Sequence, residues 1–412
     1  MSDRLLLIEP GQIRRPLRPL SVGQGHWVEA VEAFSSAWPG ETALIGHAPN
    51  PNIESVDQFI ELSSGELMRT HRTFRILLSS RLARLSSNLL AGGISSRLLR
   101  TEWESFVSAE LAGVLARELH LRKSTTVFAP TAIPAVVETI VRSARAIAPK
   151  ATEGTKFLVR FSSQGHERRY LHPRTFALQL RRWQERAGSL ALNFGVEVES
   201  VATELATHSG LPVSWVPWPV LPPSQKVGTD HESDPRKIFI YARRPEQGAR
   251  KILGLVRSLV EHFDDRVEIC ASVDNSSLAG LSAAEHEVLR SFERLTLISE
   301  NVSPSALRST IGRCGVVILP YEVQSYRRRG SALMWASLDE GVPMIAPTGT
   351  GFGEEIGRNG IGFTYGLTSE IPALVSRALE RKGGLRATIE RYQGRRAVAV
   401  SDYFASGNSA QT

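Results

Sequence analysis

Short apolar runs alternate with stretches of helical length along almost the whole chain. Consecutive rather than alternate positions are apolar in these runs, which is typical of strands buried on both faces of a parallel sheet. Repeated strand–helix–strand units of this kind predict doubly wound sheets with right-handed crossovers. The predicted strands are residues 5–9, 42–47, 125–130, 156–161, 190–195 and 212–217 in the first half, and 237–242, 266–273, 295–299, 315–320 and 342–347 in the second.

The alternation breaks in the stretch PWPVLPPSQKVGTDHESDP, residues 217–235. It holds five prolines, many polar residues and no apolar periodicity, as is typical of a linker. A chain of 412 residues also exceeds one ordinary core and fits two domains. We therefore predict an N-terminal domain (1–218), a linker (219–235), a C-terminal domain (236–390) and a final segment (391–412) that packs back on the N-terminal domain.

Composition limits the partners and the compartment. The chain has 49 Lys and Arg against 42 Asp and Glu, a net charge of +7, so it is no polycation, and nucleic-acid binding would rest on charge alone. Cys270 and Cys314 lie in apolar runs and are expected to be buried thiols in a reducing compartment. No run approaches the roughly 18 apolar residues of a membrane span, and the N-terminal MSDRLLLIEP lacks the pattern of a secretion leader. These observations favour a cytoplasmic protein without a nucleic-acid partner.

The most informative stretch is YEVQSYRRRGSALMWASLDEGVPMIAP, residues 321–347. Three consecutive arginines precede a predicted helix for which Ser331 is a suitable N-cap and Gly341 a suitable C-terminal residue. A helix N-terminus is already electropositive, so cations there are unfavourable unless an anion binds. A phosphate would meet free N–H groups, the serine hydroxyl and an arginine, and Gly330 would let the backbone approach it closely.

Three adjacent arginine side chains cannot all point into one site. We expect Arg329, nearest the helix start, to bind the phosphate, with Arg327 next and Arg328 in solvent. The alternative is a solvated arginine loop with no ligand.

This stretch resembles the donor-binding region of GT-B glycosyltransferases of the family-4 type, in which a strand ending in Pro-Tyr, a Y-x-x-R-G-S loop, a short helix and a G-x-P strand bind a nucleotide-sugar. Residues 10–34, 193–220 and 240–252 also resemble the family's first strand-to-helix loop, the end of its N-terminal domain and its diphosphate loop. The matching residues of the main stretch are Pro320, Tyr321, Tyr326, Arg329, Gly330, Ser331, Gly341, Pro343 and Pro347.

The resemblance implies an α/β protein with the GT-B fold, in which two Rossmann-like doubly wound domains face a cleft. It implies a hexosyltransferase-like enzyme of polysaccharide or glycolipid synthesis. That enzyme would retain anomeric configuration and need no cofactor beyond its nucleotide-sugar donor and no obligatory metal. The N-terminal domain would bind the glycan or glycolipid acceptor.

The expected site residues follow from these stretches. On the donor side they are Arg243, Gly248, Tyr321, Tyr326, Arg329, Gly330, Ser331, Thr350 and Glu354. On the acceptor side they are Gly25, His26 and His166. We expect His26 and Arg243 to be catalytic.

Two departures from the family pattern keep other functions open. Gln247 stands where the family has a lysine beside its diphosphate loop, and Ala336 stands where it has a glutamate that binds ribose. Arg243, which follows the first C-domain strand, is expected to compensate for the lysine. The alternatives are a catalytically inert scaffold that binds a nucleotide-sugar or a partner protein, and a nucleotide-sugar epimerase.

Three weaker stretches have two interpretations each. In PTGTGFGEEIG, residues 347–357, Glu354 suits a sugar hydroxyl, but acids are also ordinary at a helix start. His166, in the loop that follows Arg160, could touch a substrate or be solvated. The stretch 67–101 holds seven arginines and no acid, which fits a helix with a basic solvated face or peripheral contact with the anionic inner face of a membrane.

Overall fold

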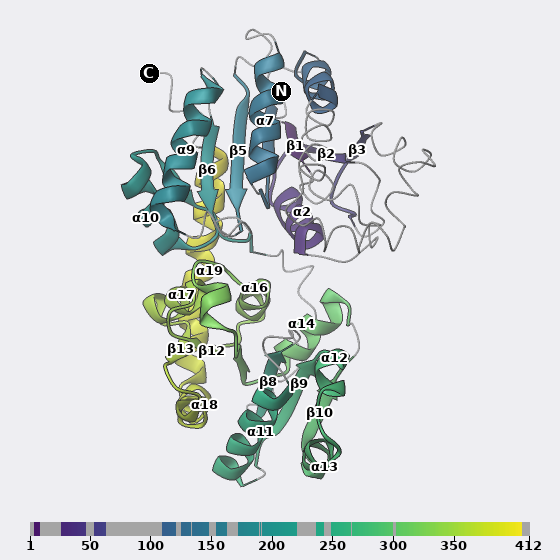
Figure 1. Ribbon diagram of the computed structural model, residues 1–412, viewed down its shortest axis with the longest axis vertical. Coiled ribbons are helices and arrows are strands. Elements are labelled where there is room, and N and C mark those ends of the chain that lie inside the picture. Colours follow the sequence, from purple (N-terminus) through teal and green to yellow (C-terminus); the bar gives the residue numbers. More distant parts are fainter. Residues whose placement is uncertain are drawn as a thin grey trace, which may run out of the picture. The chain divides into compact units, whose positions relative to one another are not determined.

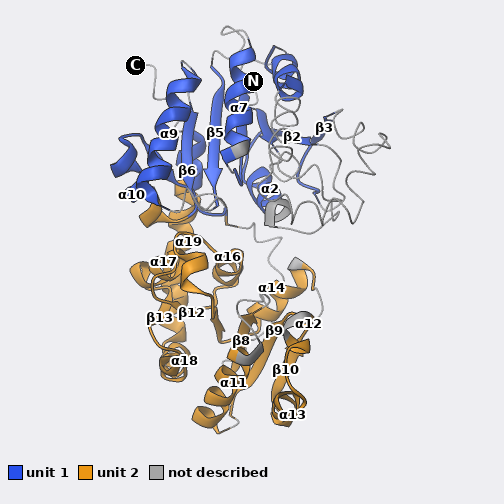
Figure 2. Ribbon diagram, viewed as in Figure 1, with its two compact units in different colours: residues 1–197, 202–219, 400–412 blue, residues 198–201, 220–399 orange. Residues whose placement is uncertain are grey.

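The chain forms two compact units, each built on its own parallel sheet (Figure 2). Unit 1 comprises residues 1–197, 202–219 and 400–412, and unit 2 comprises residues 198–201 and 220–399. The computed structural model describes residues 4–8, 26–46, 53–62, 109–120, 125–132, 134–147, 154–162, 172–188, 190, 192–220, 236–242, 249–264, 266–299 and 302–405.

Unit 1 contains, in its described part, a seven-stranded sheet in the order β3-β2-β1-β4-β5-β6-β7, with all neighbours parallel (Figure 1). Its strands are β1 (Arg4–Ile8), β2 (Glu41–Gly46), β3 (Gln58–Glu61), β4 (Thr125–Ala129), β5 (Lys156–Phe161), β6 (Leu192–Val196) and β7 (Val213–Trp215). Its labelled helices are α2 (His26–Ser36), α7 (Pro134–Ala146), α9 (Pro173–Ala187) and α10 (Glu199–Ser209), of which α10 begins in unit 2. Since α7 and α9 connect β4 to β5 and β5 to β6, right-handed crossovers place both on one face of the sheet, where they pack together.

Unit 2 contains, in its described part, a six-stranded parallel sheet in the order β10-β9-β8-β11-β12-β13. Its strands are β8 (Lys237–Ala242), β9 (Glu268–Val273), β10 (Leu295–Ile298), β11 (Val316–Ile318), β12 (Met344–Pro347) and β13 (Gly362–Tyr365). Its helices are α11 (Ala249–Phe263), α12 (Asn275–Ala279), α13 (Ala283–Ser291), α14 (Pro304–Gly312), α15 (Val323–Tyr326), α16 (Ala332–Asp339), α17 (Gly351–Asn359), α18 (Ile371–Glu380) and α19 (Lys382–Ala405), with the short 3-10 turn η4 (Thr368–Glu370).

Both sheets reverse their strand order once. In unit 1 the reversal lies between β1 and β4, and in unit 2 between β8 and β11. Such reversals open a crevice beyond the carboxyl ends of the two strands, where ligands of α/β sheets bind. The predicted α/β class with two doubly wound sheets is therefore confirmed.

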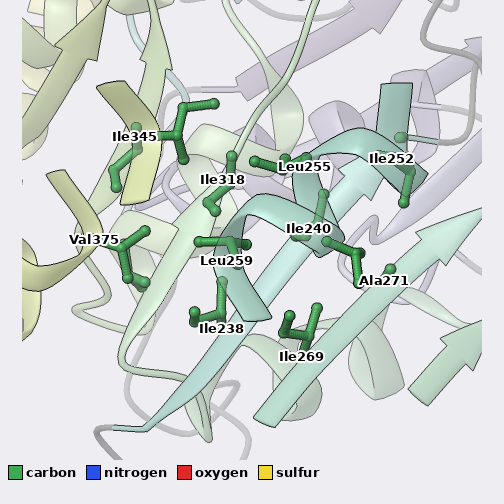
Figure 3. Close-up of a cluster of buried hydrophobic side chains, with 14 of the residues drawn as sticks. Ile238, Ile240, Ile252, Leu255, Leu259, Ile269, Ala271, Ile318, Ile345 and Val375 are labelled. Carbon is green, nitrogen blue, oxygen red and sulfur yellow. The ribbon is translucent and has the colours of Figure 1, made fainter. Parts of the chain in front are cut away.

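The core of unit 2 shows why its sequence folds this way (Figure 3). Ile238 and Ile240 on β8, two positions apart, point to the same face of the sheet. On α11, Ile252, Leu255 and Leu259 recur at helical spacing and cover that face. The alternate residues of β8 and the apolar face of α11 thus pack against each other in one hydrophobic layer.

The two cysteines lie in unit 2 and are buried, as expected, whereas the reducing compartment stays a prediction. Both Cys270 and Cys314 are buried and free. Burial raises the pKa of the Cys314 thiol to about 12, so this side chain behaves as a small apolar group.

The last turns of α19 belong to unit 1. The ring of Phe404 lies 5.4 Å from that of Phe128 and 5.1 Å from that of Trp38, between centroids, with edge-to-face geometry. The hydroxyl of Tyr403 donates to the carbonyl of Asn193 at 2.9 Å. Residues 400–405 therefore complete the core of unit 1, whereas the earlier turns of the same helix belong to unit 2.

Replacing Leu259 by alanine should destabilise the protein by about 2–5 kcal/mol, because a fully buried side chain would leave a cavity. Leu367→Ala is the matched control, since Leu367 is 67% exposed and its loss should cost less than ~0.5 kcal/mol. Urea unfolding followed by circular dichroism measures both. Equal losses for the two variants would contradict the described core.

Candidate functional site

An aromatic cluster lies at the reversal point of the second sheet. Tyr321, just beyond the carboxyl end of β11, is buried, and its ring centroid lies 4.5 Å from that of Tyr326 and 5.3 Å from that of Phe352. Tyr241, on the neighbouring strand β8, has its ring 6.4 Å from Tyr321. These aromatic side chains therefore pack together beside the crevice that is expected at the carboxyl edge of the second sheet.

Arg329 packs against this aromatic cluster. Its guanidinium carbon lies 5.5 Å from the ring centroid of Tyr326, a cation–π distance. Its backbone N–H donates to the carbonyl of Tyr326 at 3.2 Å. Arg327 is exposed, whereas Arg328, which we expected in solvent, is half-buried. The expected secondary role of Arg327 in phosphate binding stays a prediction. The region predicted as one loop also contains the short helix α15, which carries Tyr326.

The Arg329 backbone also binds α17. Its carbonyl accepts a hydrogen bond from the Phe352 N–H at 3.1 Å. Gly351 permits this approach, because a Cβ there would lie 2.8 Å from both the N and the O of Arg329. The preceding Gly349 has a φ of 84°, a left-handed conformation that favours glycine. Gly351 thus permits close packing of two backbone segments, and Gly349 permits the turn that precedes α17.

The first turn of α17 is already capped within the chain. The Thr350 hydroxyl accepts from the Gly353 N–H at 3.0 Å and donates to the Pro347 carbonyl at 2.9 Å. The Glu354 N–H donates to the Thr350 carbonyl at 2.9 Å. Thr350 is fully buried, so none of its side-chain atoms is accessible to a ligand. Its expected contact with the nucleotide-sugar donor stays a prediction.

The N-terminus of α16 differs from that of α17. Ser331 occupies the N-cap position with extended backbone angles, as predicted, but its hydroxyl makes no capping bond to the helix. Trp335 donates the first intrahelical bond, to the Ser331 carbonyl at 3.2 Å. Within the described part of the chain, the N–H groups of residues 332–334 have no hydrogen-bond partner. Three free donors beside Arg329 make this helix start a site suited to an anion.

Two adjacent acids of α17 have different surroundings. Glu355 is buried, and its carboxylate accepts from the Tyr392 hydroxyl at 2.6 Å and from the Glu199 N–H at 3.2 Å. Glu354 is exposed and accepts from the Ser200 hydroxyl at 2.9 Å. Contact of Glu354 with a sugar hydroxyl stays a prediction. The Glu355 carboxylate, by contrast, already accepts hydrogen bonds from residues of α10 and α19.

A buried ion pair that the sequence did not reveal joins α16 to α19. Arg396 is fully buried, donates to the Asp339 carboxylate at 2.9 Å, and has its guanidinium carbon 4.9 Å from a ring of Trp335. The signal was Asp339, a lone acid in the otherwise apolar helix ALMWASLD. Its partner lies 57 residues further along the chain, and no local pattern reveals such a pairing.

Unit 1 holds a buried cation at the carboxyl end of its sheet. Arg160, on β5, is fully buried and donates to the carbonyls of Val216 at 2.6 Å and Pro130 at 2.9 Å. Its guanidinium also lies 3.8 Å from the Glu197 carboxylate and faces the ring of Phe34. Burial lowers the pKa of Arg160. This arginine therefore joins the ends of several strands and makes no contact with solvent.

The remaining expected site residues lie outside the described residues. They are Gly25, His166, Arg243 and Gly248, together with the side chain of His26 and the whole basic stretch 67–101. Helix α2 begins at His26, and Arg243 directly follows the carboxyl end of β8.

Two features are absent from the described residues. No cluster of three or more His, Cys, Asp or Glu side chains there could hold a metal ion. None of the helices in this part of the chain combines the length and the apolar character needed to cross a membrane.

Comparison with known proteins identifies the fold. No family model matches the chain, and no curated protein matches it in sequence. HepE from Anabaena, solved with UDP, superposes with a TM-score of 0.56 at 12% identity over 99% of this chain and 100% of its own. A glycosyltransferase from Rickettsia africae gives 0.54 at 13% over 98% and 94%, and the trehalose-6-phosphate synthase OtsA gives 0.60 at 11% over 98% and 99%.

Likeness at these identities establishes architecture. The chain has the GT-B fold of glycosyltransferases, which confirms the predicted fold class. The narrower resemblance to the family-4 type stays a prediction.

The buried carboxyl of Glu355 generates a prediction about pH. Burial, partly offset by hydrogen bonds from Tyr392 and Glu199, raises its pKa above the ordinary value of 4.5. The folded protein therefore holds this proton more tightly than the unfolded chain, and the free energy of unfolding falls as pH rises from 4.5 through the raised pKa. Glu355→Gln removes the titration, so the stability of wild type relative to this variant should fall across that range, by at most about 1.4 kcal/mol per pH unit.

Thermal unfolding of both proteins between pH 4 and pH 8 measures this difference. Glu354→Gln, the same replacement at the exposed neighbour, controls for the loss of charge. A difference between wild type and Glu355→Gln that does not change with pH would contradict the raised pKa.

Proposed function

We propose that the protein is a glycosyltransferase that binds a nucleotide-sugar at the carboxyl end of the second sheet. The observation that carries this proposal is the start of α16, where three free N–H groups follow the fixed Arg329. Transfer of the sugar releases a nucleoside diphosphate, and preorganised N–H groups and a guanidinium stabilise the charge that develops on it. The GT-B fold, shared with HepE in its UDP complex, supports the same assignment.

The other residues take roles in keeping with their positions. Gly330 and Ser331 line the approach to the free N–H groups, while Tyr321 and Tyr326 lie beneath the loop and support Arg329. Arg243 and Gly248 bind the diphosphate from the end of β8, and Glu354 binds a hydroxyl of the donor. On unit 1, Gly25, His26 and His166 bind the acceptor, and His26 and Arg243 take part in catalysis.

The finer features of the reaction are also proposals. Transfer retains the anomeric configuration, needs no metal or other cofactor, and delivers a hexose to a glycan or glycolipid in polysaccharide or glycolipid synthesis. The protein works in the cytoplasm, and residues 67–101 contact the anionic inner face of the membrane. Positioning of the two sugars and neutralisation of the diphosphate account for the rate.

Arg329→Ala should weaken binding of UDP by about 1.5–3 kcal/mol, because a charge-assisted contact with phosphate is lost. Binding of uridine, which has no phosphate, should hardly change. Isothermal titration calorimetry measures both ligands. Arg290→Ala is the control, since Arg290 is an exposed arginine of α13, a helix outside the proposed site, and its loss should leave UDP binding unchanged. Equal losses for uridine and UDP would refute the phosphate role of Arg329.

A donor-hydrolysis assay separates an enzyme from the inert scaffold that Gln247 and Ala336 also suggest. If Arg243 replaces the missing lysine, Arg243→Ala should abolish slow release of nucleoside diphosphate, whereas Gln247→Lys should change it little. The panel contains UDP-, GDP-, ADP- and dTDP-sugars. Absence of hydrolysis and of binding across this panel, with binding gained in the Gln247→Lys, Ala336→Glu double variant, would establish the scaffold instead.

A further inference from the structure

One turn of α19, from Tyr392 to Arg396, contacts both helices of the proposed nucleotide site. Arg396 and Gln393 face α16, and Tyr392 and Arg395 face α17. Tyr392 and Arg396 are 2% and 0% exposed, so neither can touch a substrate. Their contacts nevertheless decide where the two helices lie.

The contacts with α16 fasten its last turn. Asp339, the final residue of the helix, receives the buried bond from Arg396, and the Gln393 amide donates to the Leu338 carbonyl. The Leu338 carbonyl also accepts the Gly341 N–H at 3.0 Å, so the Gln393 amide adds a hydrogen bond to a group that already has a partner. A buried carboxylate and guanidinium also cannot separate without a large desolvation cost. The carboxyl end of α16 is therefore held firmly.

The contacts with α17 hold its middle and its end. The Tyr392 hydroxyl donates to Glu355 at 2.6 Å, and Arg395 donates to the side-chain oxygen of Asn359, the last residue of α17, at 2.6 Å. The Glu355 carboxylate accepts the Glu199 N–H as well, and Arg395 also binds the Glu199 carboxylate at 2.9 Å. The α17 helix thus cannot rotate about its axis without breaking these bonds, of which the one from Tyr392 to Glu355 is buried.

Both helices are short and begin at the proposed site. A helix rises about 1.5 Å per residue, so α16 spans only about 12 Å from the Asp339 anchor to its free N–H groups. The α17 helix holds the Arg329 carbonyl through the Phe352 N–H. A tilt of either helix would move the free N–H groups away from the guanidinium of Arg329.

We propose that Tyr392 and Arg396 are positioning residues, which fix α16 and α17 so that the three N–H groups and Arg329 converge on one diphosphate. The proposal rests on the function proposed above. It assigns to this turn of α19 a role in nucleotide affinity that acts entirely through other residues.

The chain supplies a matched pair of variants for the test. Tyr392→Phe removes the bond to Glu355, and Tyr403→Phe removes the bond from an equally buried tyrosine of the same helix to the Asn193 carbonyl in unit 1. Each variant loses one hydroxyl and keeps its ring, so the two should lower the melting temperature by similar amounts. Only Tyr392→Phe should weaken UDP binding in calorimetry, by about tenfold, because small displacements of a binding group are costly.

Hydrogen exchange without ligand supplies an independent readout. The amides of residues 352–354 are bonded to Arg329 and Thr350, and they should exchange faster in Tyr392→Phe than in Tyr403→Phe. If wild type binds UDP but the two variants bind it equally, the positioning role is refuted and the proposed function stands. If wild type binds none of UDP, GDP, ADP and dTDP, the proposed function loses its support, and equal exchange at residues 352–354 in the two variants then refutes the positioning role on its own.

Discussion

The site in unit 2 depends on one close approach, between the backbone of Arg329 and the first turn of α17. The Phe352 N–H needs a partner, and the Arg329 carbonyl supplies it only because Gly351 has no side chain in the way. This contact places the arginine above Tyr326 and beside the start of α16. The first turn of α17 thus combines capping by the Thr350 side chain with a hydrogen bond that fixes the loop carrying Arg329.

Two fully buried arginines illustrate how each unit holds its strand ends and helices. Arg396 meets a carboxylate at 2.9 Å, whereas Arg160 relies mainly on two carbonyls, with its carboxylate at 3.8 Å. Removing one partner of a buried charge costs roughly 3–5 kcal/mol, although replacing a whole pair by apolar residues is often neutral. These groups therefore constrain geometry more than they add stability.

The sequence predicted what depends on local patterns. Apolar runs located most of the strands, and Ser331 and Gly341 marked the ends of α16. The strands β3 and β13 were missed because each has four residues, only partly buried, at a sheet edge. The bonds of Asp339 and Glu355 were missed because their partners come from distant turns of α19. Periodicity shows which face of a helix is buried but not what it is buried against.

The C-terminal turns of α19 have a consequence for the order in which the protein matures on the ribosome. The aromatic core of unit 1 contains Phe34 and Phe128, which are synthesised early, but it is completed by Tyr403 and Phe404. Chains generally begin to fold domain by domain as they emerge. The part of this core that Tyr403 and Phe404 cover stays open until the whole of unit 2 has been translated. Truncation within α19 therefore leaves the core of the earlier unit incomplete.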